Sequence, residues 1–239
     1  FYGFFHQNVC DEPLIFTEAP FTQGLADSIV PLLDEGAAPV DPKSRSTAIF
    51  YSISNTQTGL RGVSFGDSLI KRVVETLRLE FPKLQHFATL SPIPGLRGWL
   101  GKNVAGLLDK LDDKERLELS QALGAAPPSA ASLLAALETP LALPAASPVR
   151  QMLLRCAAHY LAQGWSDGKP LDAVARFHLG NGARVERLNW GADPSAKGLK
   201  QSWGLMVNYL YDLKRLDKHR ALLAQGKIPV SGEIESLHF

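Results

Sequence analysis

The sequence predicts a mixed protein of the α/β (α+β) class, with a mixed central sheet flanked by helices and interrupted by a helical insertion. The run "STAIFYSIS" (46–54) is β-rich without clear alternation, which is typical of a strand covered on both faces. An amphipathic helix pattern over 67–81 and a second strand, "LQHFATL" (84–90), follow it. Because short crossovers join neighbouring strands, we expect these two strands to be parallel neighbours connected by the helix.

A change in the sequence pattern predicts the insertion. Between about residues 99 and 171 the chain carries short helical patterns separated by "GAAPPSA" and "PLALPAASP", and strand signals return afterwards. We therefore expect an all-helical segment inserted into the sheet domain.

Composition limits the class of protein. A chain of 239 residues with 45% hydrophobic residues can bury a substantial core, and its net charge of +1 gives no overall bias toward nucleic acid or membrane. The sequence has no apolar run of the roughly 20 residues that a membrane span needs. Two cysteines, Cys10 and Cys156, lie far apart, so we predict a soluble cytoplasmic protein without a disulfide.

The N-terminal segment predicts a strand, a helix and an exposed connection. Residues 12–22 are rich in strand formers, residues 24–36 place apolar residues at helical spacing, and 36–45 combine proline, small and charged residues without a period. The opening "FYGFFHQN" has neither Met nor a signal-peptide pattern, so we expect a fragment that lacks an N-terminal region.

The helix pattern over 67–81 has one apolar face, and Asp67 or Ser68 can cap its start. Its apolar residues are Ile70, Val73, Val74, Leu77 and Phe81. The following strand is expected to end at "SPIPG" (91–95), where two prolines fix the backbone.

The C-terminal part predicts a hairpin and a helix. Residues 173–190, "AVARFHLGNGARVERLNW", contain two apolar-patterned runs around Asn181-Gly182, a pair typical of a tight hairpin turn. Residues 199–213, "LKQSWGLMVNYLYDL", place apolar residues on one helical stripe, and "ADPSAKG" (192–198) is expected to lead into that helix.

The loop "RGVSFGD" (61–67) stands between the first strand and the amphipathic helix. Backbone N–H groups at a helix start form a site for an anion such as pyrophosphate, and Gly62 and Gly66 allow close approach. From Arg61 to Lys102 seven Lys or Arg stand against three acids. A plain turn with solvated charges remains an alternative, and the loop matches neither a Walker A motif nor the dinucleotide fingerprint.

Three side chains are candidates for chemistry. His178 falls on a predicted strand just before the Asn-Gly turn, and histidine has the side-chain pKa nearest neutrality. Ser91 ends a strand, and Tyr211 lies in the predicted last helix. Taken from the residues alone, each also fits a structural role, as a packed histidine, a turn serine and a packed aromatic. His86, His159 and His219 are interpreted as structural or surface residues.

Four segments together resemble the malonyl-CoA decarboxylase family, in order and spacing, over most of 12–213. They are "IFYSISNTQTGLRGVSFGDSLIKRVV", "LSPIPG", "ARFHLGNGA" and "GLMVNYLYDL". The resemblance implies that residues 1–239 are the family's catalytic domain, similar to the GNAT acyltransferase fold, with the insertion at about 99–171 and without the family's N-terminal helical domain. Ser64 stands where GNAT loops usually have their first glycine and where the family often has an acid.

The resemblance also implies a carboxy-lyase of fatty acid metabolism. It would convert malonyl-CoA to acetyl-CoA and CO2 through a thioester enolate protonated on carbon, with His178 as proton donor, Ser91 as the substrate-binding catalytic serine and Tyr211 in support. The loop would bind the coenzyme A diphosphate through Arg61, Gly62, Val63, Ser64, Phe65, Gly66 and Asp67. No metal and no cofactor beyond the substrate's own coenzyme A is expected, nor a nucleic-acid or membrane partner, and the complete protein is expected to be a homo-oligomer.

Two other functions fit the same features. A GNAT-type acyltransferase would move the acyl group to an amine, and a non-catalytic acyl-CoA-binding module would keep the loop without needing both Ser91 and His178. The decarboxylase hypothesis predicts that Ser91 and His178 lie within about 8 Å of each other, close enough to flank one acyl group.

Overall fold

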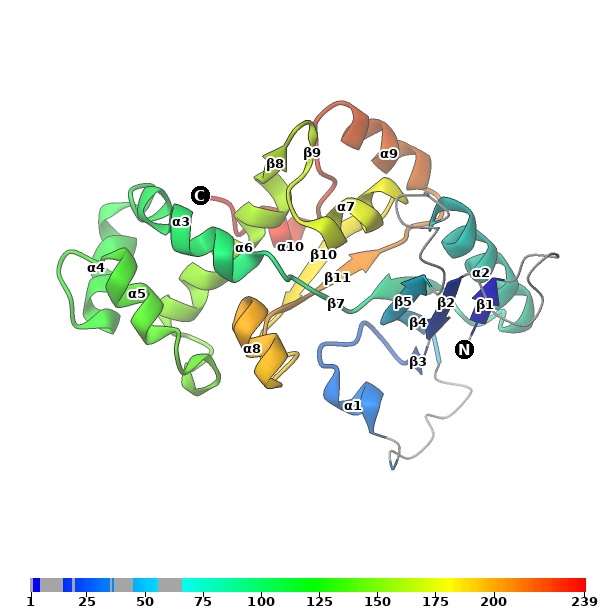
Figure 1. Ribbon diagram of the computed structural model, residues 1–239, viewed down its shortest axis with the longest axis horizontal. Coiled ribbons are helices and arrows are strands. Elements are labelled where there is room, and N and C mark those ends of the chain that lie inside the picture. The colour runs from blue at the N-terminus through cyan, green and yellow to red at the C-terminus, as the bar shows by residue number, and fades with distance from the viewer. Residues whose placement is uncertain (1, 5–14, 19, 35, 37–44, 56–65) are drawn as a thin grey trace.

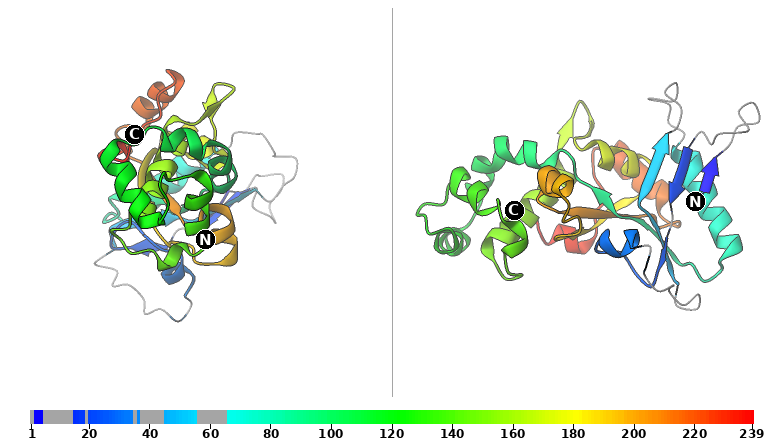
Figure 2. Two further views of the ribbon diagram at one scale, coloured as in Figure 1. Left: turned by 90° about the vertical axis from the view of Figure 1, so that its left-hand side faces the viewer. Right: turned by 60° about the horizontal axis from the view of Figure 1, so that its bottom comes forward.

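The computed structural model describes residues 2–4, 15–18, 20–34, 36, 45–55 and 66–239. The molecule is elongated, with helices α3–α6 at one end and the N-terminal strands at the other (Figure 1), and the two further views of Figure 2 agree. The strands of the described part are β1 (Tyr2–Phe4), β2 (Ile15–Glu18), β3 (Phe21–Thr22), β4 (Thr47–Phe50), β5 (Ser52–Asn55), β6 (His86–Thr89), β7 (Ser91–Pro92), β8 (Trp165–Ser166), β9 (Lys169–Pro170), β10 (Arg184–Asn189) and β11 (Met206–Leu210). Its helices are α1 (Val30–Leu33), α2 (Gly66–Glu80), α3 (Leu96–Leu108), α4 (Asp113–Leu123), α5 (Ala130–Ala136), the 3₁₀ turn η2 (Pro140–Ala142), α6 (Pro148–Gln163), α7 (Ala173–Gly180), α8 (Ala196–Ser202), α9 (Leu216–Ala224) and α10 (Gly232–Glu235).

The main sheet is mixed. Its strand order is β10-β11-β6-β4-β3, and β7 also pairs with β11. Strands β4 and β6 are parallel, with Thr47 opposite His86 and Phe50 opposite Thr89, whereas the other strand pairs of this sheet are antiparallel. The predicted parallel neighbours, joined through α2, are therefore confirmed. The first predicted strand (46–54) is divided, however, because β5 pairs with β2 in a separate three-stranded sheet.

Strand β4 is buried on both faces, as its sequence predicts. Ala48 and Phe50 belong to the large core that includes the apolar face of α2. Ile49 points to a smaller cluster on the opposite face, which is covered by residues around α1 such as Ile29 and Leu32. The apolar residues of α2 are buried as expected up to Leu77, while Phe81 just past its end is 38% exposed.

The helical insertion is confirmed from α3 to α6, but its last part is not helical, because β8 and β9 lie within the predicted range of about 99–171. Two of its helices begin with capping boxes, in which Asp112 pairs with Glu115 at α4 and Ser129 pairs with Ser132 at α5. The short two-stranded sheet of β8 and β9 follows α6. The buried residues of the insertion join those of the main sheet in one hydrophobic core, so the insertion packs as part of the same domain.

The N-terminal segment contains the predicted kinds of element, but their predicted bounds are wrong. The expected strand over 12–22 is two strands, since β2 pairs with β5 in a separate three-stranded sheet and β3 pairs with β4. The expected helix over 24–36 is reduced to the single turn α1. Pro31 favours a helix start at Val30, because proline is tolerated in the first helical turn.

Two C-terminal predictions are wrong. The first half of 173–190 is helix α7, so Asn181-Gly182 ends a helix before β10 and makes no hairpin. Residues 199–213 are divided into the end of α8 and strand β11, because Trp203 and Gly204 both have positive φ and break the helix. The expected helix entry over 192–198 is confirmed, with Ser195 capping α8.

The expectation of free thiols is confirmed at Cys156, which is buried and unpaired, while Cys10 lies outside the described residues. Burial raises the pKa of the Cys156 thiol to about 12. In the part of the chain that the structure describes, we find no helix with the length and apolarity to cross a membrane.

Candidate active site

Helix α7 carries His178 onto the sheet. Its N-terminus is capped by the buried Asp172, whose carboxylate accepts hydrogen bonds from the backbone N–H groups of Val174 and Ala175 at 2.9 and 3.0 Å. Ala175, His178 and Leu179 are the buried residues of the helix, and their spacing of three and four places them on one face. The imidazole therefore reaches the core from a helix rather than from the predicted strand.

Ser91 lies on the short strand β7, directly after β6. Its backbone pairs with Val207 of β11, and only 5% of the residue is exposed. Pro92 and Pro94 follow, so the chain leaves the sheet here toward α3.

Ser91 and His178 are in contact. The distance from Ser91 Oγ to His178 Nε2 is 3.2 Å, and both side chains are buried. The predicted proximity of these two residues is confirmed, although 87 positions separate them along the chain.

Tyr211 contacts the second ring nitrogen of His178. Its hydroxyl lies 2.8 Å from His178 Nδ1, and its backbone N–H donates to the Phe87 carbonyl at 2.8 Å. Tyr211 directly follows β11, so the prediction that it lies in a helix is wrong, while its placement beside the candidate proton donor fits the supporting role expected of it.

Aromatic rings enclose the imidazole. The Tyr209 ring is stacked on His178 with centroids 4.8 Å apart, and Phe177 contacts it edge-on at 5.0 Å. Burial lowers the pKa of His178 to about 3, because the charged ring would lose its hydration. The imidazole is therefore neutral near pH 7.

Two residues of this site were missed from the sequence. Thr89 Oγ1 accepts a hydrogen bond from Ser91 Oγ at 2.9 Å, and Tyr209 covers one face of the imidazole. Alternation along a strand was the available signal, since residues two apart share a face of the sheet. That rule pairs Thr89 with Ser91 and Tyr209 with Tyr211.

The expected phosphate loop is only partly within the described chain. Residues 61–65 lie outside it. Helix α2 begins at Gly66, so Asp67 and Ser68, the expected capping residues, lie within its first turn. A hollow of about 160 Å³ lies beside this helix and is lined by Ile70 and Val74 of α2 together with Asn181 and Tyr211. It adjoins the Tyr211 side of the Ser91–His178 contact.

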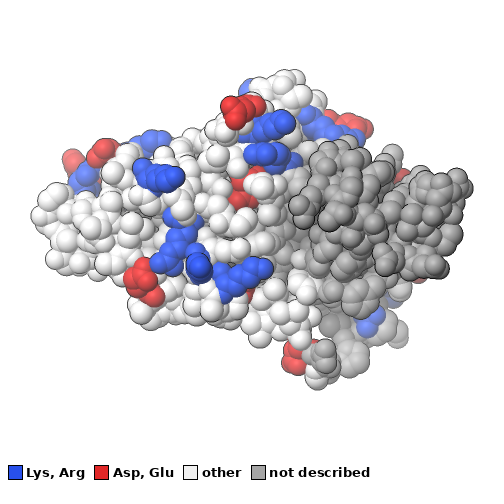
Figure 3. All heavy atoms as spheres, in the orientation of Figure 1, with Lys and Arg blue, Asp and Glu red and all other residues white. Residues whose placement is uncertain are grey.

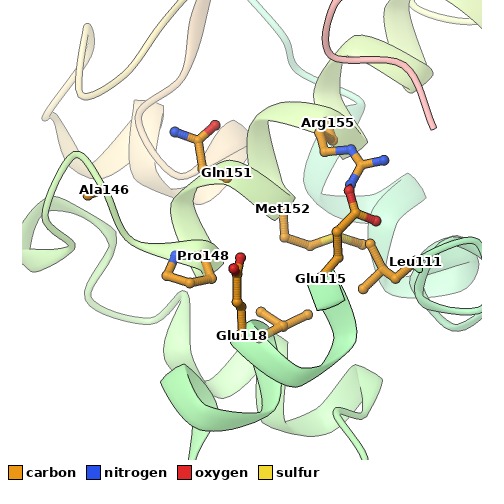
Figure 4. A pocket seen from close by; sticks show the side chains of 9 residues that line it. Leu111, Glu115, Glu118, Ala146, Pro148, Gln151, Met152 and Arg155 are labelled. Carbon is orange, nitrogen blue, oxygen red and sulfur yellow. The ribbon is translucent and has the colours of Figure 1, made fainter. Parts of the chain in front are cut away.

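A different hollow, of about 200 Å³, lies in the helical insertion and is shown in Figure 4. Leu111 and Met152 line its apolar part, and Glu115 Oε1 forms an ion pair with Arg155 Nη1 at 2.6 Å beside it. None of its lining residues belongs to the Ser91–His178 site. Its position gives it no part in the chemistry of that site.

Basic side chains gather on the face of the molecule shown in Figure 3, in a band over α8 and α3. Arg97 of α3 forms an ion pair with Glu138 and lies over the Trp203 ring, so its charge is partly neutralised by its neighbours.

Together, the fold and the site define a class: a mixed α/β domain with a serine hydroxyl and a neutral imidazole in contact inside its core. Comparison with known proteins identifies the family. The chain belongs to the malonyl-CoA decarboxylase C-terminal domain family, whose model matches residues 1–238. The resemblance found in the sequence motifs is thereby confirmed.

Similar proteins include the mitochondrial malonyl-CoA decarboxylase of Rattus norvegicus, which is 38% identical over 247 residues, covering 99% of this chain and 50% of the relative. A crystal structure of malonyl-CoA decarboxylase from Cupriavidus metallidurans is 46% identical with a TM-score of 0.86, covering 98% of this chain and 58% of that one. The corresponding structure from Rhodopseudomonas palustris is 43% identical with a TM-score of 0.83, covering 99% and 52%. The chain spans about half the length of the curated relatives it matches.

Proposed function

We propose that the protein is a carboxy-lyase that converts malonyl-CoA to acetyl-CoA and CO2. The observation that carries the proposal is the buried contact between Ser91 Oγ and His178 Nε2, in a chain that belongs to the malonyl-CoA decarboxylase family. Tyr211 on the second ring nitrogen supports it.

The reaction asks two things of the site. Loss of CO2 leaves an electron pair that becomes a thioester enolate, so the oxygen of the enolate must be stabilised and its carbon must receive a proton. The hydroxyl of Ser91 binds the malonyl carboxylate or the enolate oxygen, and His178 supplies the proton. Enclosure by aromatic rings keeps water away from the carbanion-like intermediate.

The coenzyme A part of the substrate binds along α2. Residues 61–67 hold the diphosphate at the positive N-terminal end of this 15-residue helix. The hollow lined by Ile70, Val74 and Tyr211 then takes the arm that carries the thioester. Its position between the helix and the Tyr211–His178 contact supports this path.

The assay that tests the proposal uses malonyl-CoA without any amine acceptor and follows acetyl-CoA and CO2. We expect both products from the wild-type protein. The His178→Asn variant should lose turnover by a factor on the order of 10² or more while keeping its affinity for coenzyme A, because a general acid acts in the transition state.

Full activity of His178→Asn would reject the proposed proton donor. A wild-type protein that transfers the acyl group to an added amine but releases no CO2 would instead support the acyltransferase hypothesis. A homo-oligomeric assembly of the complete protein and a cytoplasmic location stay predictions from the sequence.

A further inference from the structure

Thr89 is fixed at the end of β6 by the neighbouring strand β11. The residue is fully buried, and its Oγ1 accepts a hydrogen bond from the backbone N–H of Tyr209 at 3.1 Å. The side-chain amide of Asn208 donates to the Thr89 carbonyl at 2.7 Å and is itself bound by Asn189 at 2.8 Å. The hydroxyl oxygen and the carbonyl oxygen of Thr89 thus both accept hydrogen bonds from β11.

The Thr89 hydroxyl oxygen also accepts the hydrogen of Ser91 Oγ, at 2.9 Å. A serine hydroxyl has one hydrogen to donate. Because that hydrogen points to Thr89, the hydrogen in the 3.2 Å contact between Ser91 and His178 has to come from Nε2.

A neutral imidazole carries a hydrogen on one nitrogen only, so Nδ1 is then an acceptor. The Tyr211 hydroxyl lies 2.8 Å from Nδ1 and can donate to it. We propose that Thr89 is a positioning residue: by accepting the Ser91 hydroxyl hydrogen, it keeps His178 in the tautomer that carries its proton on Nε2, facing Ser91.

The position of this proton matters if the proposed function is correct, and the consequence for catalysis rests on that function. When the substrate binds, the Ser91 hydrogen turns from Thr89 to the substrate oxygen, while Nε2–H stays on His178. The bond between the α-carbon and the carboxylate breaks, CO2 leaves, and the electron pair forms the enolate. Nε2–H gives its proton to the α-carbon while the Tyr211 hydroxyl proton moves to Nδ1, and the tyrosinate regains a proton from water after acetyl-CoA has left the hollow that Tyr211 lines. The sum is malonyl-CoA plus one proton giving acetyl-CoA and CO2.

The other tautomer could not perform this step. Its bare Nε2 would accept the Ser91 hydrogen and would have no proton to offer on the side of Ser91. Burial lowers the pKa of His178 to about 3, so the ring is not charged near pH 7 and the proton cannot come from an imidazolium.

The direct test is the tautomer itself, read from ¹⁵N chemical shifts of the histidine rings in ¹⁵N-labelled protein without substrate. His178 is assigned by its absence from the His178→Asn spectrum. We expect the Nε2–H form in the wild type and an increased share of the Nδ1–H form in Thr89→Val, where the Ser91 hydroxyl has lost its acceptor. An Nδ1–H ring in the wild type, or an unchanged tautomer in Thr89→Val, would overturn the inference.

Kinetics give the second test. Thr89→Val should lower kcat for malonyl-CoA by a factor on the order of 10 with little change in KM, and Thr89→Ser, which keeps the hydroxyl, should restore it. Thr47→Val is the matched control, since Thr47 is also fully buried, on the adjacent strand β4, but stands opposite His86 at the far end of the pairing. It should leave kcat and the tautomer as in the wild type.

The role of Thr89 and the proposed function are tested by different outcomes. Equal losses in Thr89→Val and Thr47→Val, or no rescue by serine, would make the effect structural and reject a positioning role. A wild-type protein that releases no CO2 would reject the proposed function, while the tautomer in the substrate-free protein would still decide the role of Thr89. If Thr89→Val does not fold, Thr89→Ala, which also removes the acceptor, takes its place in both tests.

Discussion

Tyr209 and Tyr211 are two residues apart and both contact His178, yet their hydroxyls are in opposite situations. The Tyr211 hydroxyl is bonded to Nδ1, whereas the buried Tyr209 hydroxyl has no hydrogen-bond partner within the described part of the protein. Burial without a partner costs free energy, and for the same reason burial raises the pKa of Tyr209. Removal of the hydroxyl group should therefore have different effects at these two positions.

We predict that Tyr211→Phe lowers kcat for malonyl-CoA by a factor on the order of 10, because Nδ1 loses its donor while the ring that fills the core remains. Tyr209→Phe keeps the stacked ring and removes only the unpaired hydroxyl. It should keep most of the activity and unfold at the same temperature as the wild type or a higher one. Steady-state kinetics and thermal unfolding measure both, and equal activity in the two variants would contradict a role for the Tyr211 hydroxyl.

At the scale of elements, the N-terminal ends of α3 and α7 pack tightly against the side of α6. The Tyr160 hydroxyl on α6 donates to the carboxylate of Asp172 at 3.2 Å, which also caps α7. A Cβ added to Gly95, at the start of α3, would lie inside the contact distance of the Tyr160 hydroxyl. The glycine of "SPIPG" is therefore required here for space.

Gly95→Ala should destabilise the protein by roughly 1–3 kcal/mol, because the new methyl group displaces Tyr160 from Asp172. Gly98→Ala, one turn further along α3, is the matched control, since no atom lies within 4 Å of its added Cβ. It should stabilise the protein by about 0.5–1 kcal/mol through lower backbone entropy of the unfolded chain. Urea unfolding measures both. An unchanged free energy of unfolding in Gly95→Ala would mean that Tyr160 and Asp172 can move aside for the methyl group at little cost.

The sequence predicted well the elements whose signal is local and periodic. The parallel strands around α2 and the helical insertion belong to this group. Helix α7 was misread because Val174, Phe177 and other strand formers hide the spacing of its buried face, and because Asn-Gly marks a helix end as well as a hairpin. Gly204 in the expected last helix was the signal that the helix ends before β11.

At the scale of the whole molecule, the site exists only through long-range packing. Ser91 and His178 are separated along the chain by the entire helical insertion, and no spacing rule brings them together. The family resemblance predicted the pair, while Thr89 and the stacking of Tyr209 depend on the pairing of β11 with β6 and β7. The same burial that assembles the site makes the stability of the folded protein depend on pH.

In the unfolded chain the pKa of a histidine is about 6.5, whereas burial lowers that of His178 to about 3 in the folded protein. Between these values the unfolded state binds a proton that the folded state does not, so the stability is complete above about pH 6.5 and falls as the pH decreases toward 3. The side chains packed against the ring, from Ser91, Phe177, Tyr209 and Tyr211, are uncharged near neutral pH and offer the imidazolium no counter-ion. None of these side chains therefore replaces the lost hydration of the ring with an opposite charge.

We predict that acidification from pH 6.5 to 4.5 costs the wild type on the order of 2 kcal/mol more stability than it costs His178→Asn, since the asparagine binds no proton in either state. His159 and His219, whose pKa values are also lowered by burial, act in the same direction in both proteins and cancel in the comparison. His86→Asn, which replaces an exposed histidine at the start of β6, is the control for loss of a histidine outside the core. Urea unfolding at a series of pH values measures the difference, and parallel curves for the wild type and His178→Asn would show that the imidazole is protonated as easily in the folded core as in the unfolded chain.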